Sequence, residues 1–416
     1  MTVHRVDAGP LELGGGLEVL VRAALESVAV GGELEVTTPS RAVAYELPAW
    51  ARISGHEHVG EGVEDREGKR SFVVRIRRGA ATGVLAGPLP PVGEPLPVKG
   101  GHLHLSALRA AEPVPVLADP TGGLVPLGAL AEAGGPAHAW RLNERDRMWA
   151  DELASLSERA ARAQWDATRD IPWAEAAGLP AHVEQAVAQV MTYIAQNEYA
   201  ALYVPARFLP QVNPRYAEVL LWLSSHVHDE ARHVEVFTKR ALAGGARAYA
   251  LASTDLSLHS LLEESDFSAA ALLLNVLGEG TFLDLLRFVE RHAPDAATAT
   301  AARLAHRDER RHVQFGIAHV RRRLELGPDE RNALVAAAEA RAAKLTSLSG
   351  LSPLLSESLI LMASRSLQPS DLADAGSALR RLMQTMERNR VRRLRAAGFD
   401  AATARYLSDL HTPNLM

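Results

Sequence analysis

The sequence predicts a multidomain α+β protein, in which a small two-layer β-α-β-α-β-β domain precedes an all-α four-helix bundle with accessory helices. Two observations predict this fold class. Short strand-like and helix-like stretches alternate over the first 78 residues, and helical periodicity then dominates from Asn143 to about Ala397. The expected segments are 1–78 for the small domain, 79–140 for a Pro/Gly-rich linker, 141–330 for the bundle, and 331–416 for the accessory helices.

Composition limits the classes of function. The 416 residues are 47% hydrophobic with a net charge of −5, so a folded core is expected and neither nucleic acid nor a membrane is an expected partner. The longest apolar runs, such as Ala269–Leu274, are too short to span a bilayer. Residues 1–30 lack a basic segment followed by an apolar one, so a cytoplasmic protein is expected, and a homodimer is compatible with the sequence. The absence of cysteine excludes disulfides and thiolate-ligated iron.

The N-terminal domain is expected to contain four strands and two helices. The expected strands are Leu11–Leu13, Gly32–Thr37, Glu57–Gly62 and Ser71–Arg77, and the expected helices are Leu17–Val28 and Ser40–Ile53. The stretches LELGGG, SVAVGGELEV, ELPAWARISGHEHV and SFVVRIRRG resemble the TusA-type sulfur-carrier domain. That family carries sulfur on a cysteine of a Cys-Pro motif, but Gly14–Val19 contains neither residue, and a persulfide requires a thiol. A docking or stabilising module is therefore expected, with binding of a sulfur-containing substrate or partner as the alternative.

Residues 79–140 are rich in Pro and Gly and predict a linker with a few short strands, lying over the helical domain. A helical stretch over Asn143–Asp166 leads into the bundle. The first bundle helix is expected from Pro180 to Pro205, the second from Pro214 to Gly244, the third over Leu256–His292 and the fourth over Ala296–Leu326. Two or three further helices are expected before about Ala397.

A near-repeat is the strongest functional signal. Asp229–Val234 and Asp308–Val313 both read D-E-x-R-H-V, and each contains Glu-x-x-His. On a helix this spacing places a carboxylate and an imidazole on one face, one turn apart. A single Glu-x-x-His arises by chance, but two in matched contexts are much harder to dismiss.

A lone glutamate in apolar surroundings precedes each repeat, Glu198 before the first and Glu279 before the second. Glu198 precedes Glu230 by 32 residues, and Glu279 precedes Glu309 by 30. At a rise of about 1.5 Å per residue, such a gap fits the rest of one helix, a turn and the return to the same height. Four buried carboxylates without a cation would repel one another, so a metal centre is the favoured interpretation over a purely structural network.

This half of the chain resembles the ferritin-like di-iron carboxylate superfamily, whose bundles carry Glu and Glu-x-x-His on alternate helices. The D-E-x-R-H form is especially similar to oxygen-activating members, such as the large subunits of bacterial multicomponent monooxygenases. Carried over position by position, the resemblance implies the metal ligands Glu198, Glu230, His233, Glu279, Glu309 and His312. Carboxylates and imidazoles suit two iron ions, or manganese with iron.

Residues next to these ligands are candidates for supporting roles. Asp229 and Asp308 are expected to accept the free N–H of the coordinating imidazoles, and Arg232 and Arg311 either pair with them or form exposed salt bridges. His226 lies one turn before Glu230, and His306 about one turn before Glu309. Each is interpreted as a core histidine or one that supports the ligands, with a seventh ligand as the less favoured alternative.

Absences narrow the reaction. Radical-generating subunits of ribonucleotide reductase carry a tyrosine four residues after the first histidine, where this chain has Phe237, and the matching position after His312 is Gly316. A stable tyrosyl radical is therefore disfavoured, although Tyr199 and Tyr203 stay open as transient donors. Multicomponent monooxygenases carry a threonine where this chain has Leu283, which disfavours that branch.

The resulting hypothesis is a di-iron oxidoreductase that activates dioxygen to hydroxylate, N-oxygenate or desaturate a small organic substrate. Electrons would come from an external reductase or ferredoxin-like donor, or from the substrate, because no dinucleotide fingerprint is visible. The residues expected to line the pocket are Thr281, Leu277, Phe282, Phe237 and Phe315. The alternative is an iron-handling protein, either a ferroxidase or a peroxide scavenger. A closed apolar cavity at the metals would favour the oxygenase, and a carboxylate-lined channel the alternative.

Overall fold

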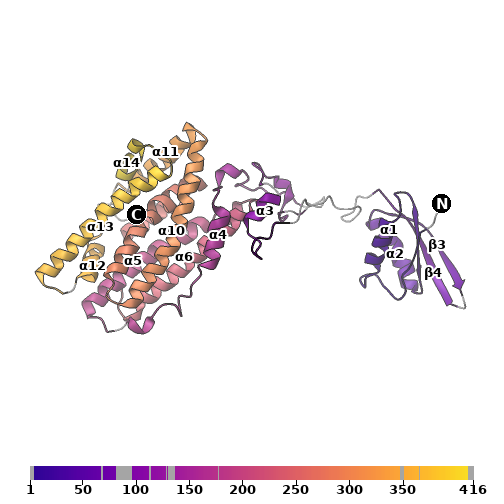
Figure 1. Ribbon diagram of the computed structural model, residues 1–416, viewed down its shortest axis with the longest axis horizontal. Helices are drawn as coiled ribbons and strands as arrows, with labels where there is room; N and C mark the ends of the chain where they lie inside the picture. Colours follow the sequence, from indigo (N-terminus) through magenta and orange to yellow (C-terminus); the bar gives the residue numbers. More distant parts are fainter. Residues whose placement is uncertain are drawn as a thin grey trace. The chain divides into compact units, whose positions relative to one another are not determined.

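The computed structural model describes residues 4–66, 69–80, 96–111, 114–127, 129, 136–176, 178–346, 351–364 and 366–410. The chain divides into two compact units, Met1–Glu94 and Pro95–Met416. Figure 1 shows the sheet with its two helices in the first unit and the helical bundle in the second. The predicted fold class, a small two-layer α/β domain followed by a four-helix bundle with accessory helices, is confirmed.

The first unit has the predicted β-α-β-α-β-β order. Its elements are β1 (His4–Asp7), α1 (Leu17–Glu26), β2 (Glu33–Thr38), α2 (Arg41–Ile53), β3 (Glu57–Arg66) and β4 (Lys69–Arg77). The strands form one sheet in the order β1-β2-β4-β3, with β1 parallel to β2 and the other neighbours antiparallel. Both helices lie on one face of the sheet, where residues such as Leu17, Val21 and Leu47 form a separate hydrophobic core.

The predicted position of the first strand is wrong. Leu11–Leu13 lies in the turn before α1, while β1 is seven residues earlier and pairs His4 with Leu34. Leu11 and Leu13 are partly buried against the same core, so their apolar character reflects packing of a loop rather than a strand ladder. Gly14 and Gly16 have φ of 78° and 110°, values that favour glycine and carry the chain into α1.

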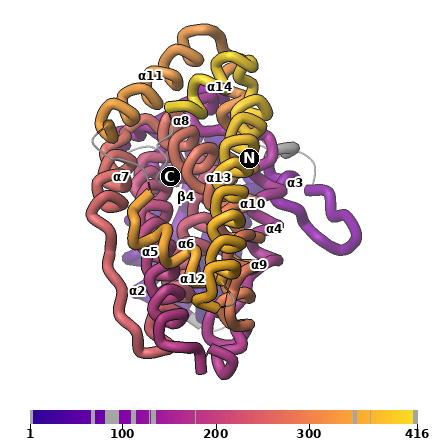
Figure 2. The backbone as a smooth tube through the Cα atoms, turned by 90° about the vertical axis from the view of Figure 1, so that its left-hand side faces the viewer, coloured from indigo at the N-terminus to yellow at the C-terminus, as the bar shows by residue number. Residues whose placement is uncertain are grey.

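The second unit is almost entirely helical. Its main elements are α3 (Ser106–Ala111), α4 (Leu153–Arg162), α5 (Ala181–Ala206), α6 (Ala217–Ala243), α7 (Ala252–Leu262), α8 (Phe267–Ala270), the π-helix η5 (Ala271–Glu279), α9 (Gly280–His292), α10 (Ala296–Glu325), α11 (Pro328–Lys344), α12 (Pro353–Ala363), α13 (Pro369–Ala396) and α14 (Ala401–Leu410). Figure 2 shows the long helices running alongside one another. The four bundle helices are α5, α6, the η5–α9 run and α10.

The third bundle helix differs from the prediction of one helix over Leu256–His292. Residues Glu263–Asp266 separate α7 from α8, and Asp266 caps α8 by accepting a hydrogen bond from the backbone of Ala269. The chain then continues through nine π-helical residues into α9. This run over Phe267–His292 is long and apolar enough to cross a membrane, but 89% of its most apolar window is buried inside the protein. Its apolar character is that of the central helix of a core.

Two other predicted segments contain less regular secondary structure than expected. Within Asn143–Asp166, only α4 is an α-helix, and a short 3₁₀ turn, Arg145–Arg147, precedes it. Within the described part of 79–140 there is no extended strand, and only isolated bridges such as Lys99 with His102 occur. Three helices follow α10 up to Ala396, as predicted, and α14 adds a fourth that the sequence analysis did not include.

Candidate metal centre

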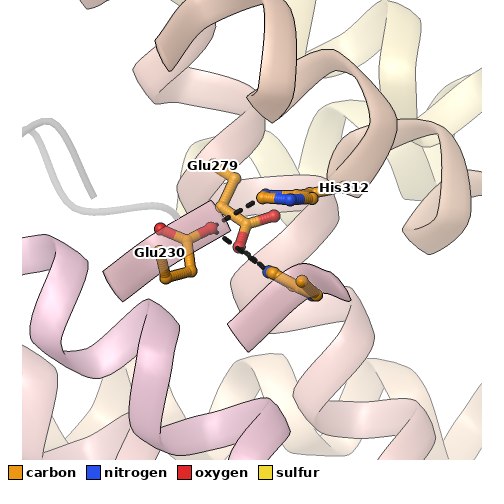
Figure 3. Close-up of side chains that lie close together, drawn as sticks. Glu230, Glu279 and His312 are labelled. Carbon is orange, nitrogen blue, oxygen red and sulfur yellow. Dashed lines mark hydrogen bonds and ion pairs between the residues drawn. The ribbon is translucent and has the colours of Figure 1, made fainter. Parts of the chain in front are cut away.

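All six predicted ligands lie together in the middle of the bundle. Glu198 is on α5, Glu230 and His233 on α6, Glu279 at the end of η5, and Glu309 with His312 on α10. Each side chain is at most 4% exposed. Figure 3 shows Glu230, Glu279 and His312 converging from three different elements. The similar spacings of 32 and 30 residues along antiparallel helices therefore place these residues in one layer.

Two groups of donor atoms are close enough to hold two cations. Site A consists of Glu198, Glu230, His233 and Glu309, and site B consists of His226, Glu230, Glu279 and His312. Within each group, one ligand atom from each residue lies within 4.8 Å of the others. Glu230 belongs to both sites, so its carboxylate can bridge two ions.

The distances support this division. Glu230 Oε2 lies 3.2 Å from His233 Nδ1, and Glu230 Oε1 lies 2.8 Å from His312 Nδ1. The two oxygens of Glu309 lie 3.4 Å from these same two nitrogens. Both imidazoles therefore present Nδ1 to the carboxylates, and Glu309 is a second carboxylate that spans the two sites.

The opposite nitrogens of the two imidazoles face aspartates. His312 Nε2 is 3.4 Å from Asp229 Oδ2, and His233 Nε2 is 3.4 Å from Asp308 Oδ2. Each aspartate thus supports the imidazole of the other repeat, not that of its own. This contact fixes which nitrogen is free to bind a cation.

Both repeat arginines are buried and bridge the two aspartates. Arg232 donates to Asp229 Oδ1 at 2.5 Å and to Asp308 Oδ2 at 2.8 Å, and Arg311 donates to Asp229 Oδ2 at 2.7 Å and Asp308 Oδ1 at 2.8 Å. Each arginine is only 6% exposed. Of the two alternatives from the sequence, the structure therefore shows the pairing with aspartate and not an exposed salt bridge.

Trp165, just after α4, belongs to the same network, and the sequence analysis gave it no role. Its indole Nε1 donates to Asp308 Oδ2 at 2.6 Å, and the guanidinium of Arg232 lies 4.7 Å from its ring. Arg232 also donates to Gln164. Trp165 and Asp308 are 143 residues apart in the sequence, so helical periodicity could not predict this contact.

His226 is closer to the centre than the sequence suggested. Its Nε2 lies 3.1 Å from Glu279 Oε1 and 3.3 Å from Glu230 Oε1, and its ring stacks on His312 with centroids 3.8 Å apart. His306 belongs to neither site and is half-buried beside Arg287 and Arg310. The structure therefore separates two histidines that the sequence placed in the same class.

Asn275 is a further contact that the sequence analysis missed. Its side-chain amide donates to Glu279 Oε2 at 2.7 Å from four residues earlier on η5. Glu279 is therefore held by Asn275 on one oxygen and by His226 on the other. The four-residue spacing of Asn275 and Glu279 on one helix could have predicted this contact.

The electrostatics are those of a site built for positive charge. Burial and the neighbouring charges of Glu230 and Glu309 raise the pKa of Glu198 well above its ordinary value. Burial opposes protonation of His233 and His312, but Glu230 and the other hydrogen-bonded carboxylates raise both pKa values well above the usual range. Excess negative charge is therefore concentrated at the donor atoms.

Some of these donor atoms also lack hydrogen bonds. Within the described part of the chain, Glu198 Oε1 and Glu309 Oε2 are buried and have no hydrogen-bond partner. An unpartnered buried carboxylate oxygen is unfavourable unless a cation meets it. The residues present therefore fit a pair of divalent metal ions.

A hollow between α5, α7 and η5 reaches the carboxylates. Glu198, Glu279 and Glu309 face it, and its walls include Ala201, Leu258, Leu261, Leu274 and Phe282. We call it the carboxylate-side hollow. Phe282 is thus in the predicted position, whereas Phe315 lines a second apolar hollow beside His226.

Three predicted pocket residues lie elsewhere. Leu277 lines a separate hollow with Ala338 and Arg341, and Thr281 donates to the carbonyl of Leu277 without facing either hollow at the centre. Phe237 is fully buried, with its ring 6.4 Å from that of His233. Leu277 and Thr281 are each two residues from Glu279, so they point to other sides of the helix.

Comparison with known proteins identifies no family. No protein-family model and no curated protein matches this chain. Among solved structures, the chain is similar to an R2-like ligand-binding oxidase with aerobically reconstituted Mn/Fe cofactor, at 19% identity over 63% of this chain and 90% of that one, with a TM-score of 0.40. A mutant of an R2-like ligand-binding oxidase with anaerobically reconstituted Mn/Fe cofactor is 16% identical over 58% of this chain and 94% of its own, with a TM-score of 0.43.

Proposed function

We propose that this protein is a non-haem oxidase or oxygenase that uses two metal ions and dioxygen to oxidise a small organic substrate. The observation that carries the proposal is the carboxylate-side hollow, whose walls are mainly apolar and whose base is formed by three of the six predicted ligands. The hollow has a volume of about 30 Å³, which is room for a molecule the size of water or dioxygen beside the ligands. A small organic substrate would enter by displacing its apolar walls.

The chain's residues would divide between the two ions as the geometry divides them. Glu198 and His233 would hold one ion in site A, and Glu279 and His312 the other in site B, with Glu230 and Glu309 shared. Iron, or manganese with iron, suits carboxylate and imidazole donors. When bound, such a pair supplies the electrons that reduce dioxygen.

The remaining residues keep these donors in place. Asp229 and Asp308 hold the imidazoles with Nδ1 toward the carboxylates. Asn275 holds one oxygen of Glu279, while Glu198 Oε1 has no hydrogen-bond partner among the described residues and would be available to an ion. Leu258, Leu261 and Phe282 would exclude bulk water from a substrate in the hollow.

The apolar lining also distinguishes this proposal from an iron-handling role. A ferroxidase or iron store must conduct hydrated cations to the site, which requires polar groups along the path. Among the described residues that line the carboxylate-side hollow, the only polar side chains are the ligand carboxylates and Asn197. This composition favours an organic substrate over a hydrated cation.

The proposal is tested with purified protein loaded anaerobically with ferrous iron, or with manganese and iron. Two metal ions per chain are expected, and reduction followed by exposure to dioxygen in the presence of candidate amines, hydrocarbons or thioethers is expected to yield an oxidised product. Ala201→Val narrows the hollow and should reduce turnover while two ions still bind, whereas Ala338→Val, behind the third helix, should retain turnover. Absence of metal uptake, or a ferric mineral formed regardless of any organic compound, would contradict the proposal.

A further inference from the structure

A basic hollow lies behind the imidazole side of the centre. Arg159 and Arg162 at the end of α4 meet Arg307, Arg310 and Arg311 of α10 around a space of about 520 Å³. The other two lining residues are Ala163 and Gln314. We call this feature the arginine hollow. Five of its seven lining residues carry a positive charge on a chain whose net charge is −5, so it is a local reversal of the protein's charge.

Much of this charge is not neutralised within the chain. Arg159 donates to the amide oxygen of Gln314 at 2.8 Å, which is a neutral acceptor. Arg307 donates to the carbonyl of Ala163 at 2.8 Å, and its Nε lies 3.9 Å from Asp308 Oδ1. Arg162 and Arg310 are exposed, and in the described part of the chain neither forms a salt bridge. An unpaired cluster of this kind attracts an anionic partner and steers its approach.

The floor of the hollow is connected to the metal centre by hydrogen bonds. Arg311 is only 7% exposed at its side chain, and its Nη2 donates to Asp229 Oδ2 at 2.7 Å. The same oxygen faces His312 Nε2 at 3.4 Å. A parallel path runs from Arg311 through Asp308 to His233. A partner seated on Arg311 would therefore be two polar contacts away from either imidazole.

We propose that the arginine hollow is the docking surface for a small acidic electron-transfer protein, of the [2Fe–2S] ferredoxin class. This inference rests on the proposed function, which requires electrons from outside the chain. Each reduced ferredoxin gives up one electron and is oxidised, so two such molecules would supply the two electrons that a metal pair held by these residues needs. The two hollows share no lining residue, since the carboxylate-side hollow takes only Glu309 from α10 and the arginine hollow takes Arg307, Arg310, Arg311 and Gln314. The substrate and the donor would therefore use different sites.

A second basic hollow provides a matched control. Arg287, Arg291 and Arg381 line a space of about 420 Å³ between α9 and α13, together with Asp284. In the described structure no hydrogen bond joins these arginines to the aspartates behind the imidazoles. Charge reversal in either hollow changes the net charge equally, so a difference between them reports location rather than total charge.

Binding is measured first, on the metal-free full chain. At low ionic strength, the double variant Arg162→Glu/Arg310→Glu is expected to weaken the Kd for a reduced or oxidised plant-type [2Fe–2S] ferredoxin by about tenfold or more. The control Arg291→Glu/Arg381→Glu should stay within about twofold of the unmodified chain. Should the charge reversal impair folding, Arg162→Gln/Arg310→Gln gives the same comparison with a smaller expected effect. Equal weakening by both pairs, or none by the first, would overturn the proposal.

Electron transfer is measured second, on the metal-loaded chain. The first pair should slow reduction by ferredoxin about tenfold, while reduction by dithionite stays unchanged. Failure to load metal would count against the proposed function and leave the binding result standing. Competition by inorganic phosphate with no measurable ferredoxin binding would show a small-anion site instead, and would overturn the docking inference alone.

Discussion

Asp229 on α6 supports His312 on α10, with Asp229 Oδ2 3.4 Å from the imidazole Nε2. The reciprocal contact joins Asp308 on α10 to His233 on α6 at the same distance. Each repeat therefore completes the other, and neither Glu-x-x-His can be oriented by its own helix alone. Burial alone would raise the pKa of Asp308, but the hydrogen bond and charge of His233, together with Arg311, lower it to about 2. The aspartate is thus an anionic acceptor throughout the neutral range.

Removing the negative charge of one aspartate should weaken the metal site that contains the histidine of the other repeat. We expect Asp229→Asn to lower metal affinity at site B, which contains His312, by about 10- to 100-fold. Asp308→Asn should do the same at site A, which contains His233. Metal titration against a chelator, with each ion followed separately by its spectroscopic signal, measures both. Weaker binding at site A in Asp229→Asn, or at site B in Asp308→Asn, would contradict the crossed arrangement.

His226 provides a nitrogen donor that is specific to site B. Its Nε2 lies 3.1 Å from Glu279 and 3.3 Å from Glu230, so His226→Gln should reduce affinity for that ion by about tenfold and change its spectroscopic signature. His306→Gln is the control, because His306 lies outside both sites and should leave metal binding unchanged. Identical metal binding and spectra for His226→Gln and the unmodified chain would show that His226 only packs against His312.

The gathering of the six ligands could be predicted from sequence because it depends on two regular quantities. The 3.6-residue helical repeat places Glu230 and His233 on one face. The number of residues from Glu198 to Glu230, and from Glu279 to Glu309, is what two antiparallel helices and a turn need to bring the chain back to the same height. Both quantities can be read from the sequence, so the prediction of the ligand positions depends little on the details of tertiary packing. The same is true of the four-helix bundle itself.

The differences arise where tertiary packing decides. The third bundle helix is broken between Leu262 and Phe267 and contains nine π-helical residues, and its apolar pattern predicted neither feature. Trp165 reaches Asp308 from outside the bundle, which no periodicity encodes. From its position one turn before Glu230, His226 could equally be an ordinary core histidine. Only its contact with Glu279 on another helix shows that it belongs to the centre.

Gly316 is required by the close approach of α10 to the π-helix. A Cβ at this position would lie 2.5 Å from Asn275 Cβ and 3.2 Å from Val276 Cγ2. Gly316→Ala should therefore lower the free energy of unfolding by about 1–3 kcal/mol. It should also weaken site B, because Asn275 holds Glu279. Chemical denaturation and metal titration measure the two effects.

Gly376→Ala on α13 is the matched control for that substitution. Its Cβ would meet only Arg380 Nη1 at 3.7 Å, so the gain in helix propensity should raise stability by about 0.5–1 kcal/mol. Equal effects of the two alanines would show that the approach at Gly316 is not tight.

His319 should make the stability of the fold depend on pH in the acidic range. Burial lowers its pKa to about 4, although its bond to the carbonyl of Trp149 acts in the opposite direction. The unfolded chain takes up this proton below about pH 6.5 and the folded chain only near pH 4, so stability falls as the pH falls between these values, by about 3 kcal/mol in total. His319→Gln should remove this part of the slope in denaturation measured from pH 7 to 4, whereas the exposed His259→Gln should not. An unchanged slope in His319→Gln would contradict the assignment.

Arg240 is a buried cation that joins three elements of the bundle. Its guanidinium donates to Glu184 at 2.7 Å, to Asp295 at 2.8 Å and to Thr298 at 2.6 Å, and its side chain is 0% exposed. Arg240→Met leaves two buried carboxylates without a counter-charge, so it should lower the free energy of unfolding by about 3–5 kcal/mol.

Neutralising the partners should recover most of this loss. In the triple variant Arg240→Met/Glu184→Gln/Asp295→Asn no carboxylate is left unpaired, and replacing a whole buried ion network by neutral groups of similar size is often close to neutral. Urea denaturation of the single and triple variants, with metal content followed in parallel, separates stability from the centre. A triple variant as unstable as the single one would show that Arg240 acts through its packing rather than its charge.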